Sequence, residues 1–258
     1  MIQTEFTIHN ESKIQLRQAH NCLLSKIFLI TFAYSFTQIG GYMIYLIACN
    51  KGGAGKTTTA TNLAVGLAKR GKSICLVDAD KQRSASKWYQ YRIEEGHQPT
   101  FLVIEKLDNI SAALTDLNEK YDFVIVDVAG RNSRELITGA TVADVVIAPH
   151  QASQLDLDTL NELQEQVIHI RDLNPRLQVY VFHAMANTNP AVKEAEREAF
   201  LGYASDFKEF QLLNSINYYR KIYRDVISEG KSVLEADNDQ AITEANSLLD
   251  EILEVSGR

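Results

Sequence analysis

The sequence predicts an α/β fold in which helices cover both faces of a mostly parallel, twisted sheet. Short apolar runs alternate along the chain with segments of helical periodicity, and this alternation is typical of βαβ units. The runs are apolar throughout rather than at every second position, which indicates strands buried on both faces. The 258 residues suffice for one domain of this kind.

Six strands are expected, with helices between and after them. The strands occupy 43–49, 73–78, 101–104, 123–127, 144–148 and 178–184. Helices are expected at 57–69, 156–172 and 190–203, and Gly71 should end the first of them. That helix carries one apolar stripe of Ala60, Leu63, Ala64, Leu67 and Ala68. A closing helix should bury Ala241, Ala245, Leu248, Leu249 and Ile252.

The first 42 residues carry no recognisable motif. Residues 27–49 form the longest apolar run and could span a bilayer by length. Gln38, Gly40 and Gly41 interrupt this run, and its last third is needed as the first strand. We therefore expect residues 1–42 to be a poorly ordered N-terminal extension, and residues 43–258 to form the domain.

The overall composition limits the classes of function. The net charge of −7 argues against a surface that is basic throughout, but not against a local basic patch. The three cysteines have no ligand spacing, and Cys49 and Cys75 lie in expected strands, which indicates core residues in a reducing cytoplasm. No pair of histidines has the spacing of a zinc site, so a His/Cys metal site is not expected.

Residues 50–57, NKGGAGKT, match the phosphate-loop signature G-x-x-x-x-G-K-[ST] except that Asn50 replaces the first glycine. Glycines let backbone N–H groups turn toward phosphate oxygens, and the following helix adds its N-terminal dipole. Lys56 should contact the β- and γ-phosphates of ATP, and the Thr57 hydroxyl should bind Mg²⁺. The nucleotide-binding residues expected here are Gly52, Gly53, Ala54, Gly55, Lys56, Thr57 and Thr58.

A second magnesium ligand is expected at Asp127. It ends the apolar run FVIVD, and open α/β sheets bind their ligands at the carboxyl ends of strands. The alternative is a structural aspartate that caps the next turn. The small residues that follow, VAG, favour the magnesium site.

Lys51 raises a separate question, because it lies five residues before Lys56. That is too early to reach its own γ-phosphate by the usual route. The pattern K-G-G-x-G-K-T-T resembles the deviant Walker loop of the ParA/MinD family of P-loop NTPases. The resemblance implies that Lys51 crosses the interface of an ATP-bound homodimer and contacts the partner's nucleotide, and that hydrolysis separates the subunits. A cation from the opposite subunit would neutralise phosphate charge at that interface.

Two later segments extend the resemblance over residues 43 to about 255. Residues 76–88, LVDADKQRSASKW, are similar to the family's motif D-x-D-P-Q-x-S. This implies that Asp80 orients the attacking water and that Asp78 supports the magnesium site, although Lys81 replaces the usual proline. Residues 184–192, AMANTNPAV, follow an expected strand where the family often supplies an adenine contact, which makes Asn187 the candidate.

Other branches of the family fit less well. The MinD branch has a basic C-terminal membrane helix, whereas the last 24 residues here carry seven acids and one arginine. The nitrogenase-reductase branch needs two cysteines after the loop, and only Cys75 lies there. Larger ParA proteins place a helix-turn-helix domain before the loop, for which residues 1–42 are too few. The sequence therefore most resembles a compact ParA-type partition ATPase that lacks an operator-reading domain of its own, and no membrane partner is expected.

Members of that branch bind DNA nonspecifically, and residues 208–231 are the candidate segment. Tyr218, Tyr219 and Tyr223 interleave its basic residues. A solvated helix face of mixed charge is an equal alternative, but a dimer would double the phosphate contacts. The predicted DNA-binding residues are Lys208, Arg220, Lys221, Arg224 and Lys231.

The resemblance implies a slow ATPase, using ATP and Mg²⁺, that dimerises on ATP, associates with the nucleoid and positions a cargo. Plasmid DNA is the first choice of cargo, and a carboxysome or other organelle is the second. A cargo-bound adaptor protein would stimulate hydrolysis. One alternative is a metabolic P-loop enzyme of dethiobiotin-synthetase-like type, in which Lys51 binds substrate. A binding module that never hydrolyses ATP is another, against which Asp80 argues.

Overall fold

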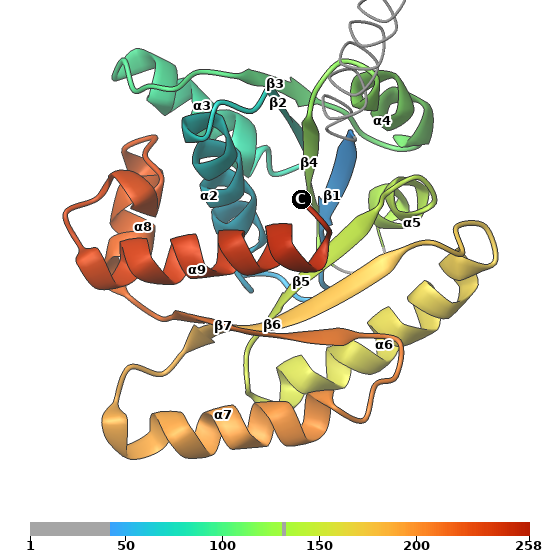
Figure 1. Cartoon of the computed structure of the whole chain (residues 1–258), viewed down its shortest axis with the longest axis vertical. Helices are drawn as coiled ribbons and strands as arrows, with labels where there is room; N and C mark the ends of the chain where they lie inside the picture. Colours follow the sequence, from blue (N-terminus) through green and yellow to red (C-terminus); the bar gives the residue numbers. More distant parts are fainter. Residues whose placement is uncertain (1–41, 131–132) are drawn as a thin grey trace, which may run out of the picture. The chain divides into compact units, whose positions relative to one another are not determined.

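The computed structural model describes residues 42–130 and 133–258. The predicted N-terminal extension, residues 1–42, therefore lies outside the described residues except for Tyr42, and the division into an extension and a domain stays a prediction. The described chain begins one residue before the first strand (Figure 1).

A seven-stranded sheet forms the centre of the domain, in the order β3-β2-β4-β1-β5-β6-β7. All of its strand pairs are parallel. The strands are β1 Met43–Ile47, β2 Ile74–Ala79, β3 Leu102–Glu105, β4 Phe123–Val128, β5 Val145–His150, β6 Gln178–Ala186 and β7 Gln211–Tyr218. The predicted α/β class and parallel sheet are confirmed.

Helices cover both faces of the sheet, as Figure 1 shows. They are α2 Lys56–Lys69, α3 Ser84–Glu94, α4 Ser111–Asn118, α5 Arg134–Ala140, α6 Gln154–Arg171, α7 Pro190–Ala204, α8 Lys221–Ser228, the short 3-10 helix η1 Val233–Glu235 and α9 Asp239–Val255. Helices α4 to α7 pack on one face, where Ile44 and Leu46 point. Helices α2, α3 and α9 pack on the other face, where Tyr45 and Ile47 point.

Each predicted strand and helix is present within a few residues of its expected bounds. The mixed-charge segment 208–231 is different, because it contains strand β7 followed by helix α8 rather than one helix face. The apolar pattern of β7 is broken by Asn214, Ser215 and Asn217, since this is an edge strand that is only partly covered. The backbone N–H groups of Asn214 and Ser215 donate to Glu251 of α9, each at 2.7 Å.

The order of the strands decides where a site can form. β1 lies between β4 and β5, and the chain runs from β1 to β2, β3 and β4 on one side of it before it crosses to β5, β6 and β7 on the other. Such a switch point opens a crevice at the carboxyl ends of the strands. The loops that follow β1, β2, β4 and β6 begin at this edge of the sheet. The residues that the sequence motifs identify lie on these loops or at the ends of these strands.

Candidate active site

The phosphate loop occupies the turn between β1 and α2. Gly53 and Gly55 have φ angles of 73° and 94°, in the left-handed region that other residues rarely adopt. Gly55 is the N-cap of α2, and its carbonyl accepts from Thr59 N at 2.8 Å. The loop therefore presents the N-terminus of a 14-residue helix to whatever binds there.

Lys56 lies inside this loop. Lys56 is 7% exposed, and its ammonium group donates a hydrogen bond to the Lys51 carbonyl oxygen at 2.8 Å. The same ammonium lies 3.8 Å from the Cys49 sulfur. A phosphate held by the loop would meet this buried cation directly, so the structure places Lys56 where the sequence motif requires it.

Thr57, Asp78 and Asp127 come together beside Lys56. The Thr57 hydroxyl donates to Asp127 Oδ2 at 2.7 Å, and Asp78 and Asp127 are register partners on β2 and β4. Asp127 is 1% exposed, and its Oδ1 has no hydrogen-bond partner among the described residues. Burial raises the pKa of Asp127 to about 7, and the nearby Asp78 carboxylate also raises it.

A buried carboxylate with an unpartnered oxygen is the donor set that a hard cation such as Mg²⁺ stabilises. Thr57 and Asp127 would hold the ion, with Asp78 in support, and the ion would neutralise phosphate charge. No group of three or more His, Cys, Asp or Glu side chains in the described chain could hold a metal alone. Phosphate oxygens and water would have to complete the coordination.

Asp80 follows β2 at the same edge. Its N–H donates to Asp78 Oδ1 at 3.2 Å, and its own Oδ1 accepts from Gln82 N at 2.9 Å. Ser86 N, in the first turn of α3, donates to Asp78 Oδ2 at 2.7 Å. These bonds fix the motif D-x-D as a tight turn, and the half-buried Asp80 carboxylate is near enough to Asp127 to help raise the pKa of Asp127.

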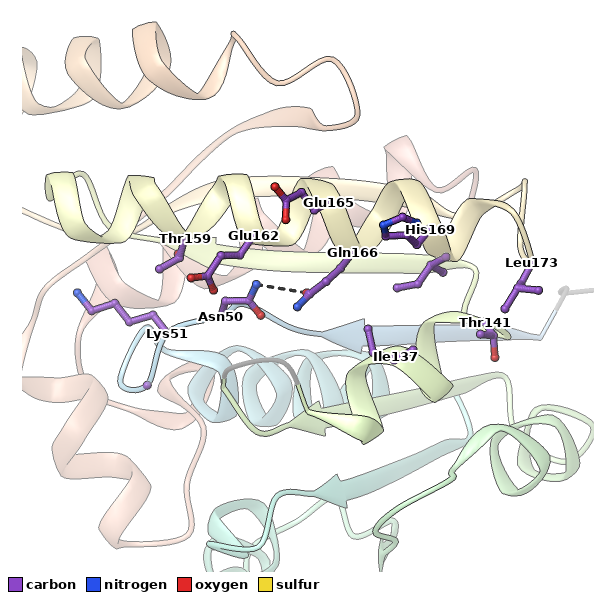
Figure 2. A pocket seen from close by; sticks show the side chains of 12 residues that line it. Asn50, Lys51, Ile137, Thr141, Thr159, Glu162, Glu165, Gln166, His169 and Leu173 are labelled. Carbon is purple, nitrogen blue, oxygen red and sulfur yellow. Dashed lines mark hydrogen bonds between the residues drawn. The ribbon is translucent and has the colours of Figure 1, made fainter.

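Lys51 starts the loop and is half-buried. Figure 2 shows its side chain extending away from Asn50, and its carbonyl is the group that holds Lys56. Gly130, after β4, lies so close that a Cβ there would be 3.0 Å from the Lys51 carbonyl carbon and oxygen. The small residues after Asp127 favour a magnesium site in the sequence, and the structure adds that Gly130 permits this close approach.

Asn187 lies at the end of β6 beside the phosphate loop. Its N–H contacts Glu196 Oε1 at 3.3 Å, and its Oδ1 accepts from Asn189 N at 2.9 Å. It lines a hollow of about 620 Å³ together with Gly53 and Arg224. The structure therefore brings this predicted adenine contact to the loop.

A neighbouring cavity of about 250 Å³ touches Gly55 and Thr58 and is closed by residues that the sequence motifs did not identify for nucleotide binding. Arg224 lies over the ring of Tyr219 at 5.2 Å, and both line this cavity. A flat guanidinium and an aromatic ring are surfaces on which a base can stack. Arg224, predicted as a DNA contact, thus borders the nucleotide site.

The five predicted DNA-binding residues lie at opposite ends of β7. Lys208 precedes β7 and the others follow it, and an eight-residue strand separates its ends by about 23 Å. Three of the five have carboxylate partners: Arg220 pairs with Glu244 at 2.6 Å, Lys221 with Asp225 at 2.7 Å and Lys231 with Glu229 at 2.8 Å. The pairs of Lys221 and Lys231 are local in the sequence, whereas Arg220 and Glu244 are 24 positions apart and meet only in the fold.

The described chain contains no helix long and apolar enough to cross a membrane.

Comparisons with known proteins identify the family of the chain. A family model described as ATPase MipZ matches residues 43–185. Maintenance of carboxysome distribution protein A from Halothiobacillus neapolitanus is 28% identical over 213 residues, which cover 80% of this chain and 94% of the relative. The chromosome-partitioning ATPase Soj from Thermus thermophilus is 31% identical over 161 residues, which cover 52% of this chain and 65% of Soj.

A solved structure of a plasmid partition protein from Borrelia burgdorferi B31, bound to AMPPNP, has the same fold. The TM-score is 0.62 at 20% identity, and the match covers 82% of this chain and 98% of that one.

Proposed function

Because the chain belongs to the MipZ family of ParA-type partition and positioning ATPases, we propose that it works as an ATP-dependent homodimer in which Lys51 contacts the partner's nucleotide. One observation carries this proposal. Lys56 already occupies the inside of the loop, 7% exposed and bonded to the Lys51 carbonyl, so the inward cationic role is filled. The Lys51 side chain extends away from Asn50, outward from the loop (Figure 2).

The catalytic roles follow from the positions of the side chains. Lys56 and the loop N–H groups would bind the phosphates, and Thr57 and Asp127 would hold Mg²⁺ with Asp78 behind them. Asp80 would orient the attacking water, because its carboxylate lies at the same edge and is held by the turn to Gln82. A residue in this role affects the chemical step rather than binding.

A protein organelle is the cargo that we favour over a plasmid, which reverses the order expected from the sequence. The carboxysome distribution protein aligns with most of this chain and nearly all of its own length. The chromosome-partitioning relative aligns with about half of this chain. An adaptor protein on the cargo would stimulate hydrolysis.

We propose that the ATP-bound dimer binds nonspecific DNA. Among the three paired residues, Lys221 and Lys231 are better candidates than Arg220, because their pairs are at the surface, with lysine side-chain exposures of 79% and 34%. Exposed ion pairs are weak, so DNA phosphates can displace the carboxylates. Arg220 is held more firmly, since Glu244 is only 11% exposed.

Purified protein tests the proposal against the metabolic alternative. DNA retention that requires ATP and Mg²⁺, with ATP turnover raised by a cargo adaptor, supports the positioning ATPase. Turnover that depends on a small acid or amine, with no ATP-dependent DNA retention, would instead support a ligase of dethiobiotin-synthetase-like type.

A further inference from the structure

Helix α8 forms one wall of the cavity of about 250 Å³ that adjoins the phosphate loop, through Tyr223, Arg224 and Ile227. We propose that Trp88 and Arg92 of α3 are positioning residues for this wall, and that they set how tightly the protein binds the base of its nucleotide. The inference rests on the proposed function only for the identity of the nucleotide, because neither DNA nor a second subunit takes part in it.

The lining of this cavity suits a nucleotide base. The Arg224 guanidinium lies over the Tyr219 ring at 5.2 Å, and flat groups of this kind stack on bases. Asn217 is 9% exposed, and its Oδ1 has no hydrogen-bond partner among the described residues. An exocyclic amine of a base would supply the donor that this buried oxygen lacks. Because Gly55 and Thr58 line the same cavity, the ribose would join such a base to phosphates held by the loop.

Helix α8 has little packing of its own to hold it. It is eight residues long, and Tyr223 and Val226 are its buried side chains. Both belong to a small apolar cluster that is separate from the clusters on the two faces of the sheet. Ile227 is partly buried and packs against the core on the face that α2 covers. The N-cap, Arg220, pairs with Glu244 of α9. A helix this short depends on such contacts with the rest of the fold, so the contacts at its two ends decide where the cavity wall lies.

The turn that follows α8 is held by α3. Trp88 is 1% exposed, and its Nε1 donates to the Lys231 carbonyl oxygen at 3.0 Å. Arg92 is 0% exposed, and its Nη1 donates to the Gly230 carbonyl oxygen at 3.1 Å. Gly230 has a φ angle of 69°, and a Cβ there would overlap the backbone nitrogen of Arg92. The backbones of α3 and this turn are therefore in direct contact, and two buried side chains fix the C-terminal end of α8.

Arg92 also holds the segment beyond the turn. Its Nη1 and Nη2 donate to the two carboxylate oxygens of Glu235 in η1, at 2.8 and 2.9 Å. At the other end of α3, Ser86 N donates to Asp78 Oδ2 at 2.7 Å, which fixes the helix to the D-x-D turn. Neither Trp88 nor Arg92 lines the cavity, so both act on the base through α8. A wall that is in place before binding reduces the ordering that the ligand must bring about.

Trp88 is the only tryptophan in the chain, so its fluorescence reports on this contact directly. ATP with Mg²⁺ should change the emission of Trp88, because a base that contacts α8 restrains the turn that accepts the indole hydrogen bond. Tripolyphosphate carries the phosphates without a base, and it should bind the loop without changing the emission. Equal changes with the two ligands, or no change with ATP, would overturn the proposal.

Two variants separate positioning from stability. Trp88→Phe removes the hydrogen bond to the Lys231 carbonyl, and Arg92→Met/Glu235→Leu removes both buried charges together, which spares most of the stability. Each should weaken ATP binding roughly fivefold in calorimetric titrations, the loss expected for one buried hydrogen bond. Tripolyphosphate binding should change by less than about twofold, because the phosphate loop is distant from both substitutions.

Tyr180→Phe is the matched control. It removes a hydrogen bond from a buried aromatic side chain to a backbone carbonyl, that of Val255 at 2.9 Å, near the start of β6 and outside the cavity lining. This variant should keep both affinities. Equal losses for ATP and tripolyphosphate in the first two variants, or ATP binding that stays at the wild-type level in both, would show that α3 does not position the base. Dimerisation and DNA retention are measured separately, so the proposed function can fail without this inference.

Discussion

Thr57 and Asp127 join the phosphate loop to the end of β4 through a hydrogen bond of 2.7 Å. The bond uses one oxygen of a carboxylate whose other oxygen, Oδ1, has no partner within the described residues. In the absence of a cation this arrangement is costly, because a buried carboxylate resists ionisation. Ionisation of Asp127 should therefore destabilise the unliganded protein, and this loss of stability can be measured.

Asp127→Asn should stabilise the unliganded protein at high pH and abolish its response to Mg²⁺. The pKa of Asp127 is raised from 3.8 to about 7, so the folded state keeps a proton that the unfolded state releases. The stabilising contribution is complete below pH 4 and disappears as the pH rises through 7, a loss of up to about 4 kcal/mol. Asparagine cannot ionise, so the variant should lack this loss.

Urea unfolding without metal or nucleotide, at pH 5 and pH 8, measures the difference. Asp116→Asn on the exposed side of α4 is the matched control and should behave as the wild type. Mg²⁺-dependent ATP affinity, titrated at pH 8, should fall at least tenfold in Asp127→Asn alone. A wild-type stability that does not change between the two pH values would contradict the raised pKa.

Asp80→Ala should bind ATP and dimerise but hydrolyse it roughly 10²-fold more slowly, because a group that orients water acts on the chemical step. Lys56→Ala should lose nucleotide affinity itself, since its ammonium lies inside the loop. Single-turnover phosphate release and a nucleotide titration separate the two effects. Equal loss of ATP binding in both variants would show that Asp80 has been given the wrong role.

His183 should make the protein less stable as the pH falls below neutrality. It is 0% exposed and stacks on Phe200 at 4.6 Å. Burial lowers the pKa of His183 from 6.5 to about 4, and the Arg197 charge lowers it further. Glu196 lies 3.4 Å away and would favour the charged ring, but burial dominates.

As the pH falls, His183 is therefore protonated near pH 6.5 in the unfolded chain but only near pH 4 in the folded chain. Stability contributed by the neutral ring is complete above pH 6.5 and falls by up to about 3 kcal/mol as the pH drops to 4. His183→Gln should show a shallower decline over that interval in urea unfolding. Parallel pH profiles for the two proteins would show that His183 does not titrate differently in the folded state.

The core strands and the phosphate loop could be predicted because their signals are local. Asp78 and Asp127 end two apolar runs, and in a parallel sheet such ends meet at one edge, as their register confirms. The rest depends on contacts between distant residues. β7 was missed because Asn214 and Ser215 are polar, and Glu251, 36 to 37 positions later, satisfies their N–H groups.

The same limit applies to charge. A set of basic residues predicts a DNA-binding surface, but the sequence could not show that Glu244 of α9, 24 positions away, pairs with Arg220. The cavity that α8 closes could not be predicted either, because Trp88 and Lys231 are 143 positions apart. A motif identifies the residues that act on a ligand, whereas the packing of other helices decides which of their atoms stay unpaired.

Arg92→Ala should cost about 3–5 kcal/mol, the usual loss when one partner of a buried ion pair is removed. Arg92 is 0% exposed and donates to both Glu235 oxygens, at 2.8 and 2.9 Å, and to the Gly230 carbonyl at 3.1 Å. Denaturant unfolding of the double variant Arg92→Met/Glu235→Leu should recover much of that loss. Should the single variant unfold like the wild type, the pair would have no structural role.

Lys51→Ala should leave the monomer able to bind ATP and prevent the ATP-bound dimer. If Lys51 served its own phosphates, the variant would bind ATP more weakly, but Lys56 already fills that position. A cation that meets a triphosphate away from water makes charge-assisted hydrogen bonds worth roughly 1.5–3 kcal/mol each. Two-fold symmetry doubles the loss, because each subunit contributes one lysine. A dimer of micromolar affinity would then be monomeric at that concentration, and ATP-dependent DNA retention should disappear with it.

Light scattering with ATP and Mg²⁺ measures dimerisation, and a nucleotide titration measures ATP binding by the monomer. Lys72→Ala, which removes an exposed lysine, is the control. A Lys51→Ala protein that still dimerises on ATP would refute the contact between subunits and leave Lys51 to act within its own chain, as it would in a metabolic enzyme.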